Sequence, residues 1–389
     1  MSDKKLKWLA GYLFLTMAVS SFVSFEPAIY DLLFMLFVVI GFLFSWYTFS
    51  RDTVFPLIIV CIFLLSNVLS LFVLMEIRSS LSFIGITIYL AFTWIGLVGI
   101  GAHFKPSTIQ FIVKGYLLSA CLSAIIGILA YLQLLPHSDL FLLFGRAKAL
   151  FKDPNVFGPF LVMPALFALS MTEIEHLSTK KKGMYFLAFL LLMSGIVLSF
   201  SRAAWGNFAI SFFLYLLIVK REAVGKRRKT MMLLGIIGIP AILLLIQTPA
   251  VEELFMSRLS YQNYDDDRFD TQKEALVSGL DNPFGIGPGQ SEYVFQYATH
   301  SLYARAITEN GVIGLLSLVL LMMASILKSY QSYQHSKGQG SIFFSVIFAS
   351  LIGISFNSFF VDTLHWRHLW ILLALAWIPA MGDDNREVN

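Results

Sequence analysis

Apolar runs of close to 20 residues recur from one end of this 389-residue chain to the other. An α-helix of about that length crosses the hydrocarbon core of a bilayer. In lipid the backbone must satisfy its own hydrogen bonds, which a helix does within one segment. The composition agrees, with 57% apolar and 13% charged residues, whereas a soluble domain carries roughly 45–50% and ~25%. The sequence therefore predicts an all-α polytopic membrane protein in contact with a lipid bilayer.

About twelve transmembrane spans are predicted from these runs. They cover residues 8–25, 28–48, 54–75, 81–101, 108–133, 156–171, 184–200, 203–219, 231–247, 302–327, 341–361 and 367–381. The first run follows Lys4, Lys5 and Lys7, as a cleavable signal peptide would, but a polytopic protein normally keeps its first span.

The chain divides into four expected regions, the third of which is a long loop between spans 9 and 10. Residues 1–133 form the N-terminal helices. Residues 134–247 form further helices and include an external loop at 134–155 and a turn at Arg202. Residues 248–301 form the long external loop, and residues 302–389 form the C-terminal helices and a short cytoplasmic tail.

The charges predict which way the spans face. With a cytoplasmic N-terminus, 18 of the 28 Lys and Arg residues fall inside, against 8 of the 24 Asp and Glu residues. Cytoplasmic loops of membrane proteins are rich in Lys and Arg. We therefore expect both termini and the basic run Lys220 to Lys229 in the cytoplasm, and the 248–301 loop outside.

Neither a disulfide framework nor a metal site is expected. The two cysteines, Cys61 and Cys121, lie inside apolar runs, and two cysteines cannot build a cysteine metal site. Oxygen ligands could come from Asp265 to Asp267, but no paired-carboxylate or His-x-x-x-His spacing supports a site there. The prediction is no metal and no cofactor.

Ten Lys and Arg residues lie outside against this bias, and several sit where a charge is costly. Arg202 lies between two apolar runs, Arg305 lies inside one, and Arg367 opens the last span. Ionisable residues at membrane depth are candidates for function. The alternatives are snorkelling to lipid headgroups or a salt bridge within a helix hairpin. Small residues after Arg202 favour the close approach of another helix instead.

A helix is expected after Asp265–Asp267, which would cap it, up to Asn282-Pro283. Arg268, in its first turn, opposes the helix dipole, so either the aspartates neutralise it or it holds an external anion. The glycine-dense stretch 282–289 follows, and such turns can offer backbone N–H groups to phosphate.

His300 begins the next apolar run on the external side, with Arg305 and Glu309 following it. A lone histidine is more often structural than catalytic. Its position at the membrane boundary beside these charges makes it a candidate base.

Five motifs in the same order resemble those of one family. They are Lys152-Asp153-Pro154-Asn155-x-x-Gly158-Pro159, Ser199-Phe200-Ser201-Arg202, Asn282-Pro283-x-Gly285-x-Gly287, His300-Ser301-x9-Gly311-x-x-Gly314 and Asp362-x4-Arg367. Over residues 140–370 the chain resembles the O-antigen ligase and O-antigen or exopolysaccharide polymerase superfamily of bacterial membrane glycosyltransferases. Leu315-Leu316 stands where ligases often have Thr-Val.

The resemblance implies a GT-C-like inverting glycosyltransferase in the bacterial inner membrane, with its active face in the periplasm. It would move a glycan from undecaprenyl diphosphate to an acceptor hydroxyl, on lipid A-core (a ligase in lipopolysaccharide biosynthesis) or on another glycan (a polymerase). Arg202 and Arg268 would bind the donor diphosphate and His300 would be the base. Arg305, Arg367, Asp153 and Asn155 are secondary candidates. No nucleic acid partner is expected.

Two other functions compete with this one. A flippase or transporter of a lipid-linked anion would want charges at mid-membrane and broken helices, whereas these cations crowd the external edge. A structural subunit would leave the external cations beside glycine-rich turns without a role.

Overall fold

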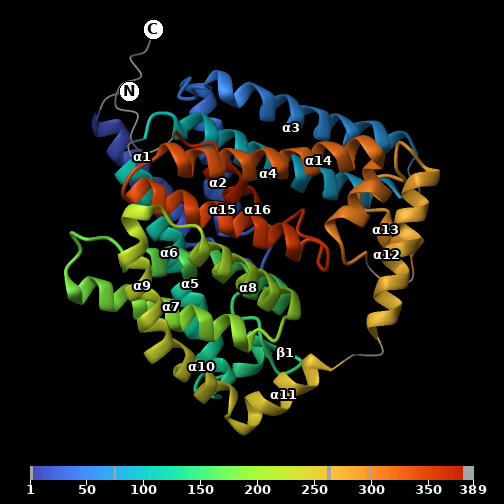
Figure 1. The fold of residues 1–389 in the computed structure, drawn as a ribbon. Helices are drawn as coiled ribbons and strands as arrows, with labels where there is room; N and C mark the ends of the chain where they lie inside the picture. Colours follow the sequence, from blue (N-terminus) through green and yellow to red (C-terminus); the bar gives the residue numbers. More distant parts are fainter. Residues whose placement is uncertain are drawn as a thin grey trace.

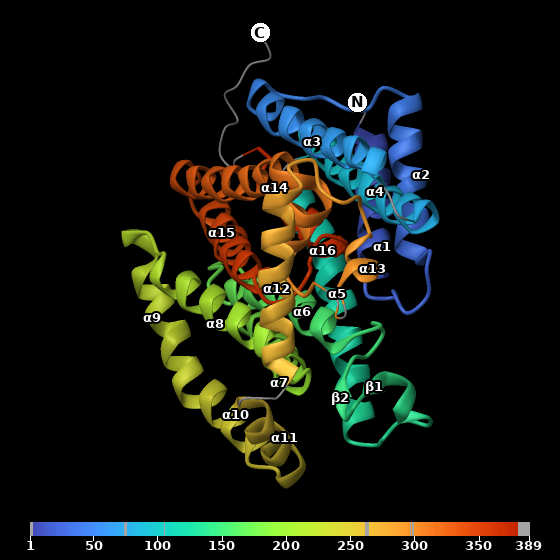
Figure 2. The ribbon, with the colours of Figure 1, turned by 90° about the vertical axis from the view of Figure 1, so that its right-hand side faces the viewer.

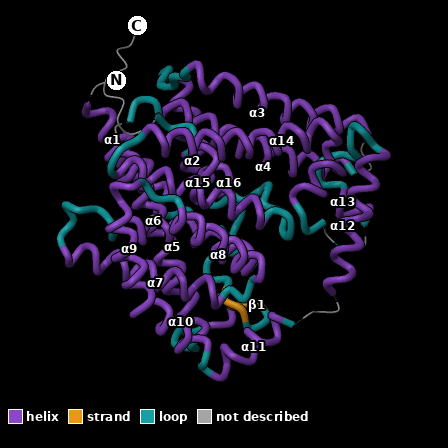
Figure 3. The backbone as a smooth tube through the Cα atoms, in the orientation of Figure 1, coloured by secondary structure: helices purple, strands orange, loops and turns teal. Residues whose placement is uncertain are grey.

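The structure is a computed structural model that describes residues 3–73, 76–104, 106–260, 264–295, 297 and 299–379. It is 77% helical (Figures 1 and 3), which confirms the predicted all-α fold. One small antiparallel hairpin pairs β1 (Leu142–Leu143) with β2 (Arg146–Ala147).

The N-terminal third is formed by five helices. They are α1 (Asp3–Ala18), α2 (Ile29–Leu43), α3 (Arg51–Leu69), α4 (Ile77–Gly101) and α5 (Pro106–Tyr131). The middle of the chain adds α6 (Pro154–Met171), α7 (Thr179–Leu198), α8 (Arg202–Leu217), α9 (Val224–Leu233) and α10 (Ile239–Ile246). The last two run on through a π-helical turn, Leu234–Gly238.

The predicted external loop 248–301 is largely helical. It contains α11 (Pro249–Leu259), α12 (Tyr264–Asp281) and α13 (Ser291–Val294). The helix expected there exists, but Asp265–Asp267 lie inside its first turn rather than before it, so the capping interpretation was wrong. The chain then forms α14 (Leu302–His335), α15 (Gln339–Asn357) and α16 (Arg367–Leu375).

Every predicted span overlaps a helix, but some of these helices are too short to cross a membrane by themselves. Eight helices in the described residues are long and apolar enough to cross a membrane. Four others are shorter: α1, α2, α8 and α16 have 16, 15, 16 and 9 residues. The count of twelve spans therefore stays a prediction.

Helices α6 and α15 form the centre of the bundle. Nearly every residue of α6 is buried, and α15 packs against α6, α8 and α14. Helix α12 stands outside this bundle and packs along the first part of α14, as Figure 2 shows from the front. Helices α12 and α13 of the 248–301 segment thus lie against α14.

A break in α14 is where the glycine-dense turn 282–289 docks. Gly311 has φ +70°, and a Cβ at this position would lie 2.0 Å from the Pro283 carbonyl oxygen. The N–H of Gly287 donates to the Glu309 carbonyl oxygen (3.1 Å), and that of Gly289 to the Glu309 carboxylate (2.8 Å). These N–H groups bind α14, so the expectation that the turn offers them to phosphate was wrong for these two residues.

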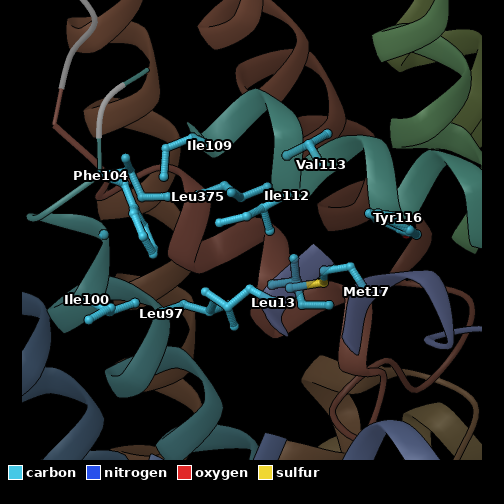
Figure 4. Close-up of a pocket in the computed structure, with 13 residues that line it drawn as sticks. Leu13, Met17, Leu97, Ile100, Phe104, Ile109, Ile112, Val113, Tyr116 and Leu375 are labelled. Carbon is cyan, nitrogen blue, oxygen red and sulfur yellow. The ribbon is translucent and has the colours of Figure 1, made fainter. Parts of the chain in front are cut away.

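A small cavity between α1, α4, α5 and α16 is lined by apolar side chains (Figure 4). Leu13, Leu97, Ile112 and Leu375 face one another there. The hydroxyl of Tyr116, the one polar side chain at its edge, donates to the Phe160 carbonyl oxygen (2.8 Å). This cavity of about 20 Å³ is a gap in helix packing with no group for chemistry.

Candidate active site

A cavity of about 650 Å³ lies where the hairpin, the start of α8, α12 and the start of α14 meet. Its size is that of sites that take a small-molecule ligand, roughly 300–1,000 Å³. The described residues that line it come from seven segments of the chain. They are Phe144, Arg146, Asn155, Phe200, Arg202, Ala203, Gly206, Arg258, Asp265, Arg268, Phe269, Gln272, Tyr297, His300, Phe356, Phe360 and Val361.

Arg202 lies in this cavity because the chain turns sharply between α7 and α8. Phe200 has φ +47°, and the Ser201 hydroxyl accepts the Ala204 N–H (3.3 Å), which caps α8. Arg202 is therefore the first residue of α8. Its guanidinium donates to both carboxylate oxygens of Asp265, with Nη1 at 2.9 Å from Oδ2. The salt bridge foreseen as an alternative exists, but it joins α8 to α12 rather than the two arms of one hairpin.

Arg268 and Gln272 project from one side of α12, four residues apart. Arg268 donates to the Phe360 carbonyl oxygen (2.7 Å), and Gln272 donates to the His300 carbonyl oxygen (3.1 Å). Further along the same side, Ala275 is fully buried, and a Cβ on Gly279 would lie 2.8 Å from Ile307 of α14. Helix α12 thus packs closely on α14, and its Gln272 side chain fixes the backbone at His300.

His300 lies just before α14, whose first turn is capped by the Ser301 hydroxyl. Its side chain is half-buried and lines the cavity. In the described part of the chain its imidazole forms no hydrogen bond. Burial, and then the nearby Arg268 guanidinium, lower the pKa of His300 below its usual 6.5. The ring is therefore neutral at pH 7 and able to accept a proton.

Asp153 and Asn155 belong to the start of α6. The Asp153 carboxylate accepts the Asn155 N–H (2.6 Å) as the N-terminal cap. The Asn155 side-chain oxygen accepts a hydrogen bond from Arg146 Nη2 (2.9 Å), and Arg146 Nε donates to the Ser199 carbonyl oxygen (3.0 Å). Asn155 lines the cavity, whereas Asp153 orders the helix start beneath it.

Arg305 lies apart from this cavity, in a buried cluster of charges. It donates to Glu309 (3.1 Å), to Glu292 (3.0 Å) and to Asp362. Its guanidinium also stands over the ring of Phe83, 5.0 Å from its centre. Three carboxylates account for this cation without a substrate.

Arg367 is engaged in the same way by a carboxylate of α2. Its Nε donates to Asp31 Oδ1 (2.6 Å), and its Nη2 donates to Asp31 Oδ2. Tyr89 donates to the same carboxylate (2.9 Å). Neither Arg305 nor Arg367 is among the described residues that line the cavity, and the geometry gives both a structural role that joins distant helices.

Two further arginines, Arg146 and Arg258, line the cavity. The sequence did not mark either of them as a candidate site residue. Both were visible as external cations against the charge bias, which was the only signal for them. The aromatic residues Phe144, Phe269 and Tyr297 also line it. Their position could not be read from the sequence, because they come from separate segments.

No group of three or more His, Cys, Asp or Glu residues in the described ranges is arranged to hold a metal ion.

Residues 187–319 match the model of a family described as O-antigen ligase. The predicted resemblance to the O-antigen ligase and polymerase superfamily is confirmed. The matched region runs from α7 to the first half of α14 and so contains Arg202, Arg268 and His300. The comparison with curated proteins finds no match. The family indicates an enzyme of the ligase or polymerase type that acts on lipid-linked glycans in the bacterial inner membrane.

Proposed function

We propose that this protein is an inverting glycosyltransferase of the periplasmic face, which moves a glycan from undecaprenyl diphosphate to an acceptor hydroxyl. The acceptor is lipid A-core for a ligase, or a second lipid-linked glycan for a polymerase of surface polysaccharide.

The observation that carries the proposal is that one cavity joins Arg202, Arg268 and His300. These three residues are the ones expected to bind the diphosphate and to act as the base, and they come from α8, α12 and the loop before α14. A guanidinium offers paired donors that fit phosphate oxygens and stays charged at any ordinary pH.

In the proposed step, His300 takes the proton of the acceptor hydroxyl. The oxygen of that hydroxyl attacks the anomeric carbon of the donor sugar from the side opposite the diphosphate. The bond from this carbon to the diphosphate oxygen breaks, and its electron pair leaves with undecaprenyl diphosphate. One carbon–oxygen bond forms as another breaks, which inverts the anomeric configuration.

The charge of the cavity suits this leaving group. Four arginines and one aspartate stand among the described lining residues, a formal excess of three positive charges with His300 neutral. Negative charge grows on the diphosphate as the bond breaks, and fixed cations stabilise it best in a partly dry site. The Asp265 carboxylate holds the Arg202 fork in position between substrates.

The position of the basic segment supports a periplasmic active face. Lys220 lies beyond the far end of α8 from Arg202, and it donates to the Ser336 carbonyl oxygen (2.6 Å) at the far end of α14 from His300. The cavity and the basic run thus lie at opposite ends of the same helices, as the charge bias predicts.

The test is a reconstitution without ATP. Purified protein would be incubated with undecaprenyl diphosphate glycan and candidate acceptors, and the products analysed for lipid-free glycan and linkage. We expect donor consumption, undecaprenyl diphosphate release and a product of inverted configuration, and the product identifies the acceptor. Movement of the donor across vesicles without any cleavage would instead establish the transporter.

A further inference from the structure

The rim of the active cavity carries three exposed aromatic rings from three separate segments. Phe144 at the hairpin tip is 85% exposed, while Phe269 of α12 and Tyr297 before α14 are about half exposed. Core packing does not explain rings that are this open. All three belong to the cavity that holds His300.

Phe144 is placed at a cost to the backbone. It is the first of two residues in the β1–β2 turn, with φ +51°, and Gly145 follows with φ +72°. Two-residue turns with positive φ at both positions strongly prefer Asn, Asp or Gly at the first. A bulky residue in this conformation is an outlier that calls for an explanation.

We infer that these rings form a carbohydrate-binding rim, on which sugar units of the glycan stack as they pass to and from His300. This inference rests on the proposed function for the identity of the glycan. A sugar ring has an apolar face of C–H groups and an edge of hydroxyls. Aromatic rings match the face, while the amides Asn155 and Gln272 and the arginines, which line the same cavity and are less exposed than the rings, offer hydrogen-bonding groups to the hydroxyls.

The arrangement fits a saccharide better than a lipid headgroup layer. Aromatic residues that anchor a protein in the membrane form belts around its outer surface. These rings instead converge from the hairpin, α12 and the loop before α14 on one cavity that also contains guanidiniums and an imidazole.

The test uses Phe144→Asn, which removes the ring and gives the turn a residue that it prefers. The probe is the oligosaccharide freed by mild acid from the lipid-linked glycan of the expressing cells, titrated into detergent-solubilised full-length protein. Phe25→Asn is the matched control, since Phe25 is 86% exposed and lies outside the cavity. The loop that carries Phe25 is held in place because the N–H of Val23 donates to the Leu150 carbonyl oxygen.

We expect Phe144→Asn to weaken oligosaccharide affinity about two- to tenfold, the range of one lost ring contact, with Phe144→Trp close to the parent. Phe144→Asn should also unfold at the same or a higher temperature than the parent, a result that a structural role for the ring would reverse.

Equal oligosaccharide affinity for Phe144→Asn, Phe25→Asn and the parent would overturn the inference, and this is the result that a membrane anchor gives. The measurement needs neither donor nor turnover, so it separates the two proposals. Weakened affinity in a protein that transfers no glycan would keep the rim and reject the transferase. Normal glycan transfer with unchanged oligosaccharide affinity would keep the transferase and reject the rim.

Discussion

At the scale of single residues, His300 separates chemistry from binding. If it is the base, His300→Ala should lower glycan transfer by a factor of about 10²–10⁴ and leave donor affinity nearly intact. His300→Gln keeps a hydrogen-bonding side chain but cannot accept the proton, so it should fail to a similar degree. Donor affinity and transfer rate would be measured for each variant. Near-normal transfer by His300→Gln would exclude His300 as the base.

The pH profile gives an independent test of the same residue. Burial and the Arg268 charge lower the pKa of His300 below 6.5. The neutral, active ring should therefore persist through pH 6.5, and activity should fall only at more acidic pH, as the ring becomes protonated. A transfer rate that is already halved above pH 7 would contradict this assignment.

Unlike changes at His300, changes at Arg202 and Arg268 should weaken donor affinity as well as transfer. An ammonium cannot reproduce the paired donors of a guanidinium, so Arg202→Lys and Arg268→Lys should weaken both donor affinity and transfer. The loss of one charge-assisted contact costs about 1.5–3 kcal/mol, which is roughly ten- to 150-fold. Lys273→Ala is the control, as it removes an exposed cation from the same helix. Full activity in both Arg variants at normal membrane levels would reject the diphosphate site.

At the scale of elements, Arg305 holds three segments together rather than a substrate. Arg305→Leu would leave the buried Glu309 and the nearby, partly buried Asp362 without their cation. Removal of one partner from a buried ion pair destabilises a protein by about 3–5 kcal/mol. We expect a much lower unfolding temperature and poor recovery from the membrane. A stable Arg305→Leu protein that lacks only donor affinity would return Arg305 to the binding residues.

The fold also depends on the break in α14 at Gly311. Gly311→Ala would place a Cβ against the Pro283 carbonyl oxygen at a positive φ, with a backbone cost of about 1–2 kcal/mol before any clash. Gly183→Ala is the control, because this glycine lies in α7 with open space around it. It should be neutral or slightly stabilising. Thermal unfolding of both variants in detergent would decide, and equal unfolding temperatures would contradict the packing described here.

These elements show what the sequence could and could not predict. Length and hydropathy predicted the helices, and the small residues after Arg202 correctly indicated the close approach of another helix, since a Cβ on Gly206 would lie 2.7 Å from the ring of Phe356 in α15. The partners of Arg305 and Arg367 could not be predicted, because Asp31 and Asp362 reach them across long sequence separations. The glycine turn was misread for the same reason, since Glu309 accepts its N–H groups from another segment.

At the scale of the whole molecule, orientation is the remaining prediction. Residues 248–301 should lie in the periplasm and 220–230 in the cytoplasm, because Lys and Arg are concentrated on the cytoplasmic side. Ser278→Cys and Ala223→Cys would be treated in intact cells with a membrane-impermeant thiol reagent, in a background without Cys61 and Cys121. Labelling at 278 alone is expected. Labelling at 223 alone would reverse the map and place the cavity in the cytoplasm.

The closing side of the cavity comes from the turn that follows α15, where the Phe360 carbonyl oxygen holds Arg268 and Val361 completes the wall. The cavity thus joins residues as far apart in the sequence as Phe144 and Val361. A chain cut before residue 356 would lack this wall, so on the proposed function it could not hold Arg268 for a donor.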